Sequence, residues 1–314
     1  MEYANSNAKS AFTYIPTTAG RGTGSPVPGA PPLAAAGTIP PMSDTPDLDA
    51  VAALVRDTAR QVLPARFARV AHRHKGDGSL VTEADQVMER ALGGALARRW
   101  PGIGFLSEEM PPEVQQARLD RAGAGLWCLD PLDGTTNFTA GFPFFSVSLA
   151  LLQAGTVGLG VVYDPLRDEC FAARRGGGVR LNGAPLARPP ATGLALADCV
   201  AVVDFKRLPP ELARLLATRQ PYRSQRNLGT CALEWAWLAA GRFQLYLHGG
   251  QKLWDRAAGA LILEEAGGFC RGLEDRSLEG ARLRPQSVVA AQEAEHFHSW
   301  CRWLREAGAL AGPD

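Results

Sequence analysis

The chain has 314 residues, a length that predicts roughly two domains of about 150 residues each, or one two-lobed body. Its hydrophobic content of 46% and charged content of 21% are ordinary for a globular enzyme. The net charge is only +1, from 33 basic and 32 acidic residues, which argues against a nucleic-acid partner because such surfaces need a basic excess. An anionic ligand must therefore be bound by a local site.

The six cysteines are widely scattered and form no C-x-x-C pair, a pattern that disfavours zinc sites and redox motifs. We expect reduced, mostly buried thiols in a cytoplasmic protein. No apolar run approaches the ~20 residues of a membrane span, and the N-terminus lacks the basic and apolar regions of a signal peptide. We therefore expect no membrane partner.

Residues 1–43 differ from the rest of the chain, because Gly, Pro, Ala, Ser and Thr dominate without any hydrophobic period. This composition predicts a disordered tail. Apolar residues then recur at helical spacing and predict a helix over 48–66. The polar, Gly-containing residues 72–80 predict a loop or hairpin.

A second helix is predicted to begin after Thr82, where Asp85 completes a capping box, and to end at residues 101–102, Pro-Gly. Short apolar runs beyond it predict strands, with hairpin turns at Gly155 and at the Asn-Gly pair 182–183. We expect this strand-rich half to be antiparallel. The runs are 103–107, 126–129, 144–152, 156–163 and 168–173.

From about residue 195 strands and helices alternate, an order that predicts an α/β layer. The expected strands are 199–203, 243–247 and 287–291. The expected helices are 209–218, 233–240, 253–266 and 293–306.

Several acidic residues stand at the ends of predicted elements and not on helix faces. Some follow strands, and others lie in the first turn of a helix. Ligand sites of layered α/β proteins form at such positions. The residues are Asp85, Glu108, Glu109, Asp130, Asp133 and Asp255.

The segment from Asp130 to Thr136 is the most informative of these places. Pro131 keeps Asp130 extended, and Gly134 permits a sharp turn. The N–H groups of Thr135 and Thr136 then begin a new element and can cradle an anion. One turn thus offers two carboxylates for a hard cation and amides for a phosphate. Phosphomonoester hydrolysis with Mg²⁺ needs both.

Each feature taken alone also has a structural explanation. An isolated Asp-Gly usually marks a turn, a Glu pair is usually a solvated loop, and an acid at a helix start favours the helix dipole. An EF-hand is excluded because its alternating Asp ligands and terminal Glu are missing. The functional interpretation depends on the combination.

Three motifs, in this order and spacing, resemble the inositol monophosphatase family of Mg²⁺-dependent, lithium-sensitive phosphatases. Residues 104–109 are similar to the family's G-E-E segment. Residues 127–138 match D-P-[IL]-D-G-T-T-N-F, and residues 254–259 match W-D-x-A-A-G. The resemblance covers nearly all of residues 46–310 and leaves the tail outside it.

The resemblance implies roles for individual residues. For the metal, it implies a ligand set of Glu108, Asp130, the Leu132 carbonyl, Asp133 and Asp255. For catalysis, it implies that the attacking water is oriented and deprotonated by Thr135 and Asp85, with Glu108 also at the catalytic centre. For the substrate, it implies contacts from Gly134, Thr135, Thr136, Cys231 and His248, with the amides of Gly134 and Thr135 on the phosphate. It implies that Glu109 either supports the metal ligands or binds a third ion. It implies that Lys75, in the polar loop before Thr82, approaches the phosphate or a weak third ion, unless it is an ordinary surface lysine.

The resemblance also implies a fold of mixed α+β and α/β class, the layered α-β-α-β-α sandwich of the inositol monophosphatase and fructose-1,6-bisphosphatase type. It implies a homodimer that hydrolyses a small phosphomonoester with two or three Mg²⁺ ions. The implied mechanism is direct attack by metal-activated water, without a phospho-enzyme. We expect an N-terminal lobe over 44–190 that carries the metal site and a C-terminal lobe over 191–314 that completes it.

His248 departs from the family pattern, because inositol-processing members carry a Glu seven residues before the Asp of W-D. A carboxylate accepts two hydroxyl hydrogens, whereas neutral imidazole accepts one and donates one. We therefore expect altered recognition of the sugar hydroxyls, unless His248 simply packs beside the pocket. Cys231 stands where the family has a small residue, and no base lies beside it in sequence, so we expect no cysteine nucleophile.

The leading prediction is a phosphatase for a small polyol or sugar phosphate. Within this class the alternatives are 3′-phosphonucleotide and histidinol-phosphate hydrolysis, which Thr136 disfavours because those relatives usually carry a basic or bulkier residue there. The alternative of another class is a catalytically weak regulatory or RNA-polymerase-associated binding protein on the same scaffold. The presence of every expected metal ligand argues against it.

Overall fold

The computed structural model describes residues 46–68, 72–74, 80–123, 125–274, 278 and 280–310. The predicted tail over 1–43 and Lys75 lie outside the described residues. The residues from Pro46 onward cluster as one compact unit, so the division into lobes at residue 190 stays a prediction.

Two helices near the start of this unit form as their sequences predict. Helix α1 (Leu48–Val62) begins at Asp47, whose side chain accepts a hydrogen bond from the Ala50 amide at 2.9 Å. It buries one apolar face and ends before a short 3₁₀ turn, η1 (Pro64–Arg66), because proline cannot continue an α-helix. Helix α2 (Glu83–Arg99) has the predicted capping box, with Thr82 as its N-cap.

A seven-stranded sheet contains the predicted strand-rich half. Its first two strands run parallel, and every later neighbour is antiparallel, which confirms the predicted antiparallel half. Hairpin turns occur at Gly155 and at Asn182-Gly183, all with positive φ. In spatial order the strands are β3 (Gly104–Ser107), β4 (Leu126–Asp133), β5 (Ser146–Gln153), β6 (Thr156–Asp164), β7 (Glu169–Arg174), β8 (Val179–Leu181) and β9 (Ala184–Pro185).

A five-stranded sheet contains the alternating half. Four of its strands run in one direction, and only the fourth strand in the spatial order runs antiparallel to its two neighbours. In spatial order they are β11 (Ser224–Arg226), β10 (Val200–Asp204), β12 (Leu245–Gln251), β14 (Gln286–Ala291) and β13 (Phe269–Arg271). The accompanying helices are α5 (Pro210–Thr218), α6 (Cys231–Ala239), α7 (Leu253–Glu265) and α8 (Ala294–Glu306).

A few elements were not predicted from the sequence. Strands β11 and β13 have three residues each, too few to show a periodic pattern. Helix α3 (Pro112–Asp120) is mostly polar and buries only Gln115, so it carries no apolar stripe. The remaining short elements are β1 (His72–His74) and β2 (Leu80–Thr82), which pair antiparallel, and the 3₁₀ turns η2 (Leu196–Asp198) and η3 (Phe205–Arg207).

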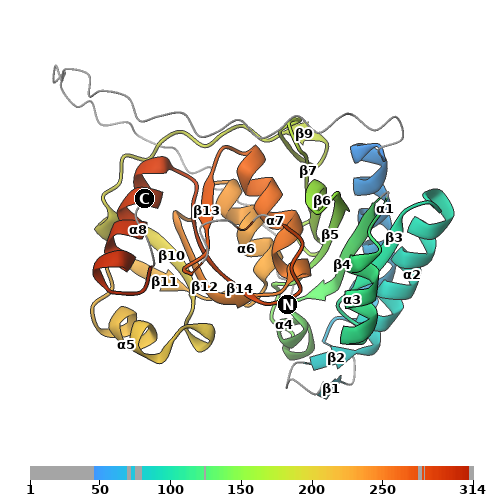
Figure 1. Ribbon diagram of the computed structural model, residues 1–314, viewed down its shortest axis with the longest axis horizontal. Coiled ribbons are helices and arrows are strands. Elements are labelled where there is room, and N and C mark those ends of the chain that lie inside the picture. Colours follow the sequence, from blue (N-terminus) through green and yellow to red (C-terminus); the bar gives the residue numbers. More distant parts are fainter. Residues whose placement is uncertain are drawn as a thin grey trace, which may run out of the picture. The chain divides into compact units, whose positions relative to one another are not determined.

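Helices and sheets alternate in five layers, which confirms the expected α-β-α-β-α sandwich (Figure 1). Three apolar cores fill the spaces between these layers. The first core lies between helices α1 and α2 and one face of the seven-stranded sheet. The second fills the space around α6 and α7, between the two sheets. The third lies between the five-stranded sheet and helices α5 and α8. The middle core therefore joins the two halves of the chain.

All six cysteines are free thiols, and four of them are buried. None of the described helices combines the length and apolarity that a membrane crossing requires.

Candidate metal and phosphate site

An irregularity in β4 brings two acids to one face of the seven-stranded sheet. Asp130 lies opposite Ser148 and Asp133 lies opposite Ser146, so three steps along β4 match two steps along β5. Residues three apart in a regular strand point to opposite faces, and one extra residue reverses this. The bulge contains Pro131, which has no N–H to donate to the ladder. Asp130 and Asp133 therefore both face α6 and α7.

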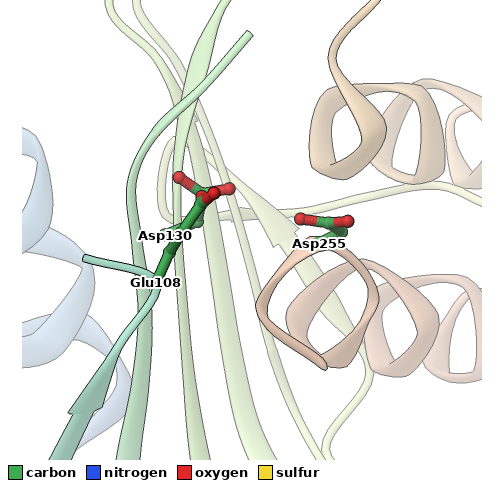
Figure 2. A group of neighbouring side chains, drawn as sticks. All are labelled: Glu108, Asp130 and Asp255. Carbon is green, nitrogen blue, oxygen red and sulfur yellow. The ribbon is translucent and has the colours of Figure 1, made fainter. Parts of the chain in front are cut away.

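Three carboxylates from separate segments converge beside this bulge. Glu108 follows β3, Asp130 lies in β4 and Asp255 is the third residue of α7. Their ligand oxygens lie within 4.8 Å of one another. Figure 2 shows Glu108 and Asp130 side by side, with Asp255 across from them at the start of α7. An all-oxygen donor set of this kind fits a hard divalent cation such as Mg²⁺.

Burial and the repulsion between carboxylates raise the pKa values of Asp130 and Asp255. Asp130 is buried and faces the charges of Glu108, Asp133 and Asp255, which together raise its pKa well above the usual value. Burial, followed by the charges of Glu108 and Asp133, raises the pKa of Asp255 to about 7. Carboxylates crowded in this way hold protons near neutral pH, and a bound cation relieves the repulsion.

Asp133 lies at the same face, with its carboxylate on the N-terminus of α6. It accepts hydrogen bonds from the amides of Cys231 and Ala232 at 3.0 and 2.8 Å and from the Thr230 hydroxyl at 2.6 Å. Ser146 adds a fourth at 3.2 Å. Burial raises the pKa of Asp133 to about 6, although these hydrogen bonds lower it. Asp133 thus ties the seven-stranded sheet to α6.

Gly134 follows Asp133 at a position that only glycine fits. Its φ is +92°, and a Cβ there would lie 3.0 Å from the Phe144 carbonyl oxygen. The chain then starts helix α4 (Thr135–Ala140). Thr135 Oγ1 lies 3.2 Å from Asp85 Oδ1 and 3.0 Å from the Leu132 carbonyl oxygen. The predicted pair Thr135 and Asp85, 50 residues apart in sequence, is therefore in hydrogen-bond contact.

The turn before α6 is held by two side chains. Asn137 donates to the carbonyl oxygens of Phe144 and Leu228 at 2.8 and 2.7 Å, so it links α4 to this turn. Glu234, buried in α6, accepts from the amides of Leu228 and Gly229 at 3.0 and 3.1 Å. Burial raises the pKa of Glu234 to about 8. No sequence motif marks Glu234, because its position within α6 is that of an ordinary helix residue.

His248 in β12 is buried, and protein groups contact both of its ring nitrogens. The Gly250 amide donates to Nδ1 at 3.1 Å, so Nε2 carries the proton and points to Asp204 Oδ2 at 3.3 Å. Burial lowers the pKa of His248, which keeps the ring neutral. Cys231 Sγ lies 3.5 Å from the same Nε2, and burial raises the pKa of its thiol. A protonated thiol of this kind is not a nucleophile.

The remaining predicted residues lie around this centre. Glu109 follows Glu108 and is half-buried, outside the group of three carboxylates. Thr136 is exposed in the first turn of α4. Sequence analysis missed Asp204, which no motif contains and which only the pairing of β10 with β12 brings opposite His248.

Comparison with known proteins identifies the family of this chain. The model of the inositol monophosphatase family matches residues 45–307, and the chain belongs to this family. It is 37% identical to an inositol-1-monophosphatase of Mesorhizobium japonicum over 70% of this chain and 80% of the relative. It is 36% identical to a protein named Nus factor SuhB of Pasteurella multocida, over 62% of this chain and 72% of that one.

A solved structure of the Thermotoga maritima IMPase superposes with a TM-score of 0.68 at 28% identity. The alignment covers 83% of this chain and 99% of that one. The fold and the family are thereby shown, and the family is one of phosphatases.

Proposed function

We propose that this chain is a Mg²⁺-dependent phosphomonoesterase that acts on a small polyol or sugar phosphate. The observation that carries the proposal is the convergence of Glu108, Asp130 and Asp255 next to the Thr135–Asp85 hydrogen bond. A cation site and a polar pair able to orient water thus adjoin one turn.

The residues of this site have separate roles in the proposed reaction. Glu108, Asp130 and Asp255 would hold a cation, with Asp133 and the Leu132 carbonyl available for a second ion. Bound Mg²⁺ supplies positive charge that neutralises a phosphate and acidifies water. Asp85 accepts a hydrogen bond from the Thr135 hydroxyl. This contact would orient the hydroxyl oxygen to accept a hydrogen bond from the attacking water. The amides at Gly134 and Thr135 start α4 and would bind phosphate oxygens.

A phosphate-release assay over a panel of phosphomonoesters, with Mg²⁺ and with EDTA, tests the proposal. We expect turnover that needs Mg²⁺. In Asp130→Asn we expect a loss of about 100-fold or more in kcat, because a central carboxylate of the cation site is gone. The matched control is Asp57→Asn, an exposed acid of α1 that is ion-paired with Arg56 at 3.4 Å.

Two results would contradict this proposal. Absence of turnover on every phosphomonoester would overturn the enzymatic function. Equal turnover in native protein and Asp130→Asn would overturn the assignment of the site while leaving the family unchanged.

A second proposal, a regulatory binding role, is favoured by the similarity to a protein named Nus factor SuhB. It predicts Mg²⁺ binding by calorimetry without turnover on any ester of the panel. Measurable Mg²⁺-dependent hydrolysis with a low KM would count against a purely regulatory role.

We also propose a homodimer in the cytoplasm. The six free thiols support a reducing compartment. Light scattering after size-exclusion chromatography is expected to give twice the mass of the chain, and a monomer mass would contradict the dimer. Recovery of the native protein in the soluble cytoplasmic fraction would test the location.

A further inference from the structure

Basic residues gather at one edge of the five-stranded sheet, beside the acidic centre. Strands β11, β10 and β12 are parallel, so their carboxyl ends share this edge. Strand β10 ends at Asp204, and η3 follows it at once with the exposed side chains of Lys206 and Arg207. The carboxyl edge of parallel strands is where α/β proteins bind ligands.

Asp204 holds this edge together. Its Oδ2 lies 3.5 Å from Arg207 Nε and 3.3 Å from His248 Nε2. Its Oδ1 accepts from the Lys206 amide at 3.2 Å and from Asn227 Nδ2 at 3.4 Å. Burial raises the pKa of Asp204, but the His248 hydrogen bond and the charges of Lys206 and Arg207 outweigh burial and lower it. Asp204 is therefore an ionised anchor whose oxygens all have partners.

Arg207 is tied closely to the acidic centre. The backbone of η3 packs on Gly249 so tightly that a Cβ at Gly249 would overlap the Arg207 carbonyl oxygen. Gly249 lies in β12, just ahead of α7 and Asp255. Burial raises the pKa values of Asp255 and Cys231, and the positive charge of Arg207 offsets a small part of this rise. The Arg207 side chain nevertheless stays 47% exposed.

His248, in contrast, is poorly placed to bind a ligand, because it is buried and both ring nitrogens contact protein groups. It is 2% exposed, and its two ring nitrogens face Gly250 and Asp204. The position that carries a hydroxyl-binding carboxylate in inositol-processing relatives thus holds a neutral ring with occupied nitrogens. The exposed side chains that follow Asp204 in the chain, Lys206 and Arg207, are cationic.

We propose that Arg207, anchored by Asp204 and assisted by Lys206, forms a second anion subsite beside the cation site. The substrate accordingly carries an anionic group, a carboxylate or a second phosphate, in addition to the phosphate that is hydrolysed. This inference rests on the proposed phosphatase function and narrows its substrate class. Guanidinium groups favour carboxylate and phosphate over hydroxyl because their hydrogen bonds to anions are charge-assisted.

Three substrates with one carbon skeleton test the subsite. Glucose 6-phosphate has a neutral remainder, 6-phosphogluconate adds a carboxylate and glucose 1,6-bisphosphate adds a phosphate. We expect native protein to prefer at least one anionic substrate by about 10- to 100-fold in kcat/KM. The better of the two identifies the second group. In Arg207→Gln we expect the three kcat/KM values to converge, with glucose 6-phosphate little changed.

The control variant is Arg214→Gln on α5, where the exposed arginine pairs with Glu211 at 2.5 Å. It is expected to keep the native preference. Equal kcat/KM for the three substrates in native protein would overturn the subsite. So would an equal loss on all three in Arg207→Gln, because Arg207 would then serve only the shared phosphate or the cation site.

Calorimetric binding of the same compounds in the presence of Mg²⁺ separates this inference from the proposed function. If no ester is hydrolysed, the phosphatase proposal fails. The subsite still stands if the anionic compounds bind more tightly to native protein than to Arg207→Gln while glucose 6-phosphate does not. Identical affinities in both proteins would overturn it.

Discussion

At the residue scale, the hydroxyl of Thr135 provides the most direct test of the proposed catalytic arrangement. It lies 3.2 Å from Asp85 Oδ1 and so links α2 to the turn that carries the acids of β4. We expect Thr135→Val to lower kcat by about 100-fold or more, because the hydroxyl that we propose to orient the attacking water is lost. Phosphate release measures this effect.

Thr139 offers a matched control in the same helix. Its Oγ1 donates to the Thr136 carbonyl oxygen at 3.0 Å, a hydrogen bond within α4. Thr139→Val is expected to keep kcat within about twofold, with any stability change within ~1 kcal/mol. Equal losses of kcat in both variants would show that α4 is merely perturbed and that Thr135 has no specific role.

The raised pKa values of the acids predict how pH and Mg²⁺ act on stability. In the metal-free protein Asp133 and Asp255 have pKa values of about 6 and about 7, above those of an unfolded chain. The native state therefore binds more protons than the unfolded state, and stability falls as pH rises through these values. We expect Mg²⁺ to raise the melting temperature more at pH 8 than at pH 5.

Thermal unfolding at the two pH values, in EDTA and in Mg²⁺, measures this linkage. Asp57→Asn, away from the centre, is expected to show the native behaviour. A Mg²⁺-induced shift of the same size at pH 5 and pH 8 would mean that protons and cation do not compete for these carboxylates.

At the element scale, two glycines within helices distinguish the effect of helix propensity on stability from the effect of packing between helices. In α2, a Cβ at Gly94 would meet only the flexible end of Arg98, at 3.4 Å. In α7, a Cβ at Gly259 would overlap the Trp235 side chain of α6. We expect Gly94→Ala to stabilise the protein by about 0.5–1 kcal/mol and Gly259→Ala to destabilise it by about 1–3 kcal/mol.

Chemical denaturation of the two variants measures both effects. Similar stabilisation by both would show that α6 and α7 move apart at little cost. Because α7 carries Asp255, we also expect Gly259→Ala to weaken Mg²⁺ binding, whereas Gly94→Ala leaves it unchanged.

How well the sequence predicted each element depended on its burial. Helix α1 and strands β5 and β6 bury long apolar stretches, and their positions were predicted within a few residues. Helix α3 and strands β11 and β13 were missed because they are short or mostly polar. Such elements form because neighbouring strands and loops supply partners, and a local pattern does not contain that information.

At the scale of the whole molecule, the middle core predicts one cooperative unfolding transition. It includes residues from both proposed lobes, such as Cys128 and Phe171 from the first and Trp235 and Leu261 from the second. Asp133 and Asn137 add hydrogen bonds across the same boundary. Neither half can bury these surfaces alone, so a fragment of residues 44–190 is expected to stay unfolded.

Calorimetry of the intact chain, and circular dichroism of the fragment, test this prediction. A calorimetric enthalpy equal to the van't Hoff enthalpy is expected. Two separate transitions, or a folded fragment, would show that the lobes are independent domains.

The sequence by itself determined the family, the order of the main elements and the identity of the acids at their ends. Short motifs achieve this because a cation site requires carboxylates and a tight turn requires glycine, and both requirements are visible locally as at Asp130 and Gly134. Only the tertiary structure decided which groups meet. The bulge in β4 turned Asp133 toward α6, and the pairing of β10 with β12 set Asp204 against His248. Such contacts depend on the register between strands distant in sequence, and strand register is a property of the packed core as a whole.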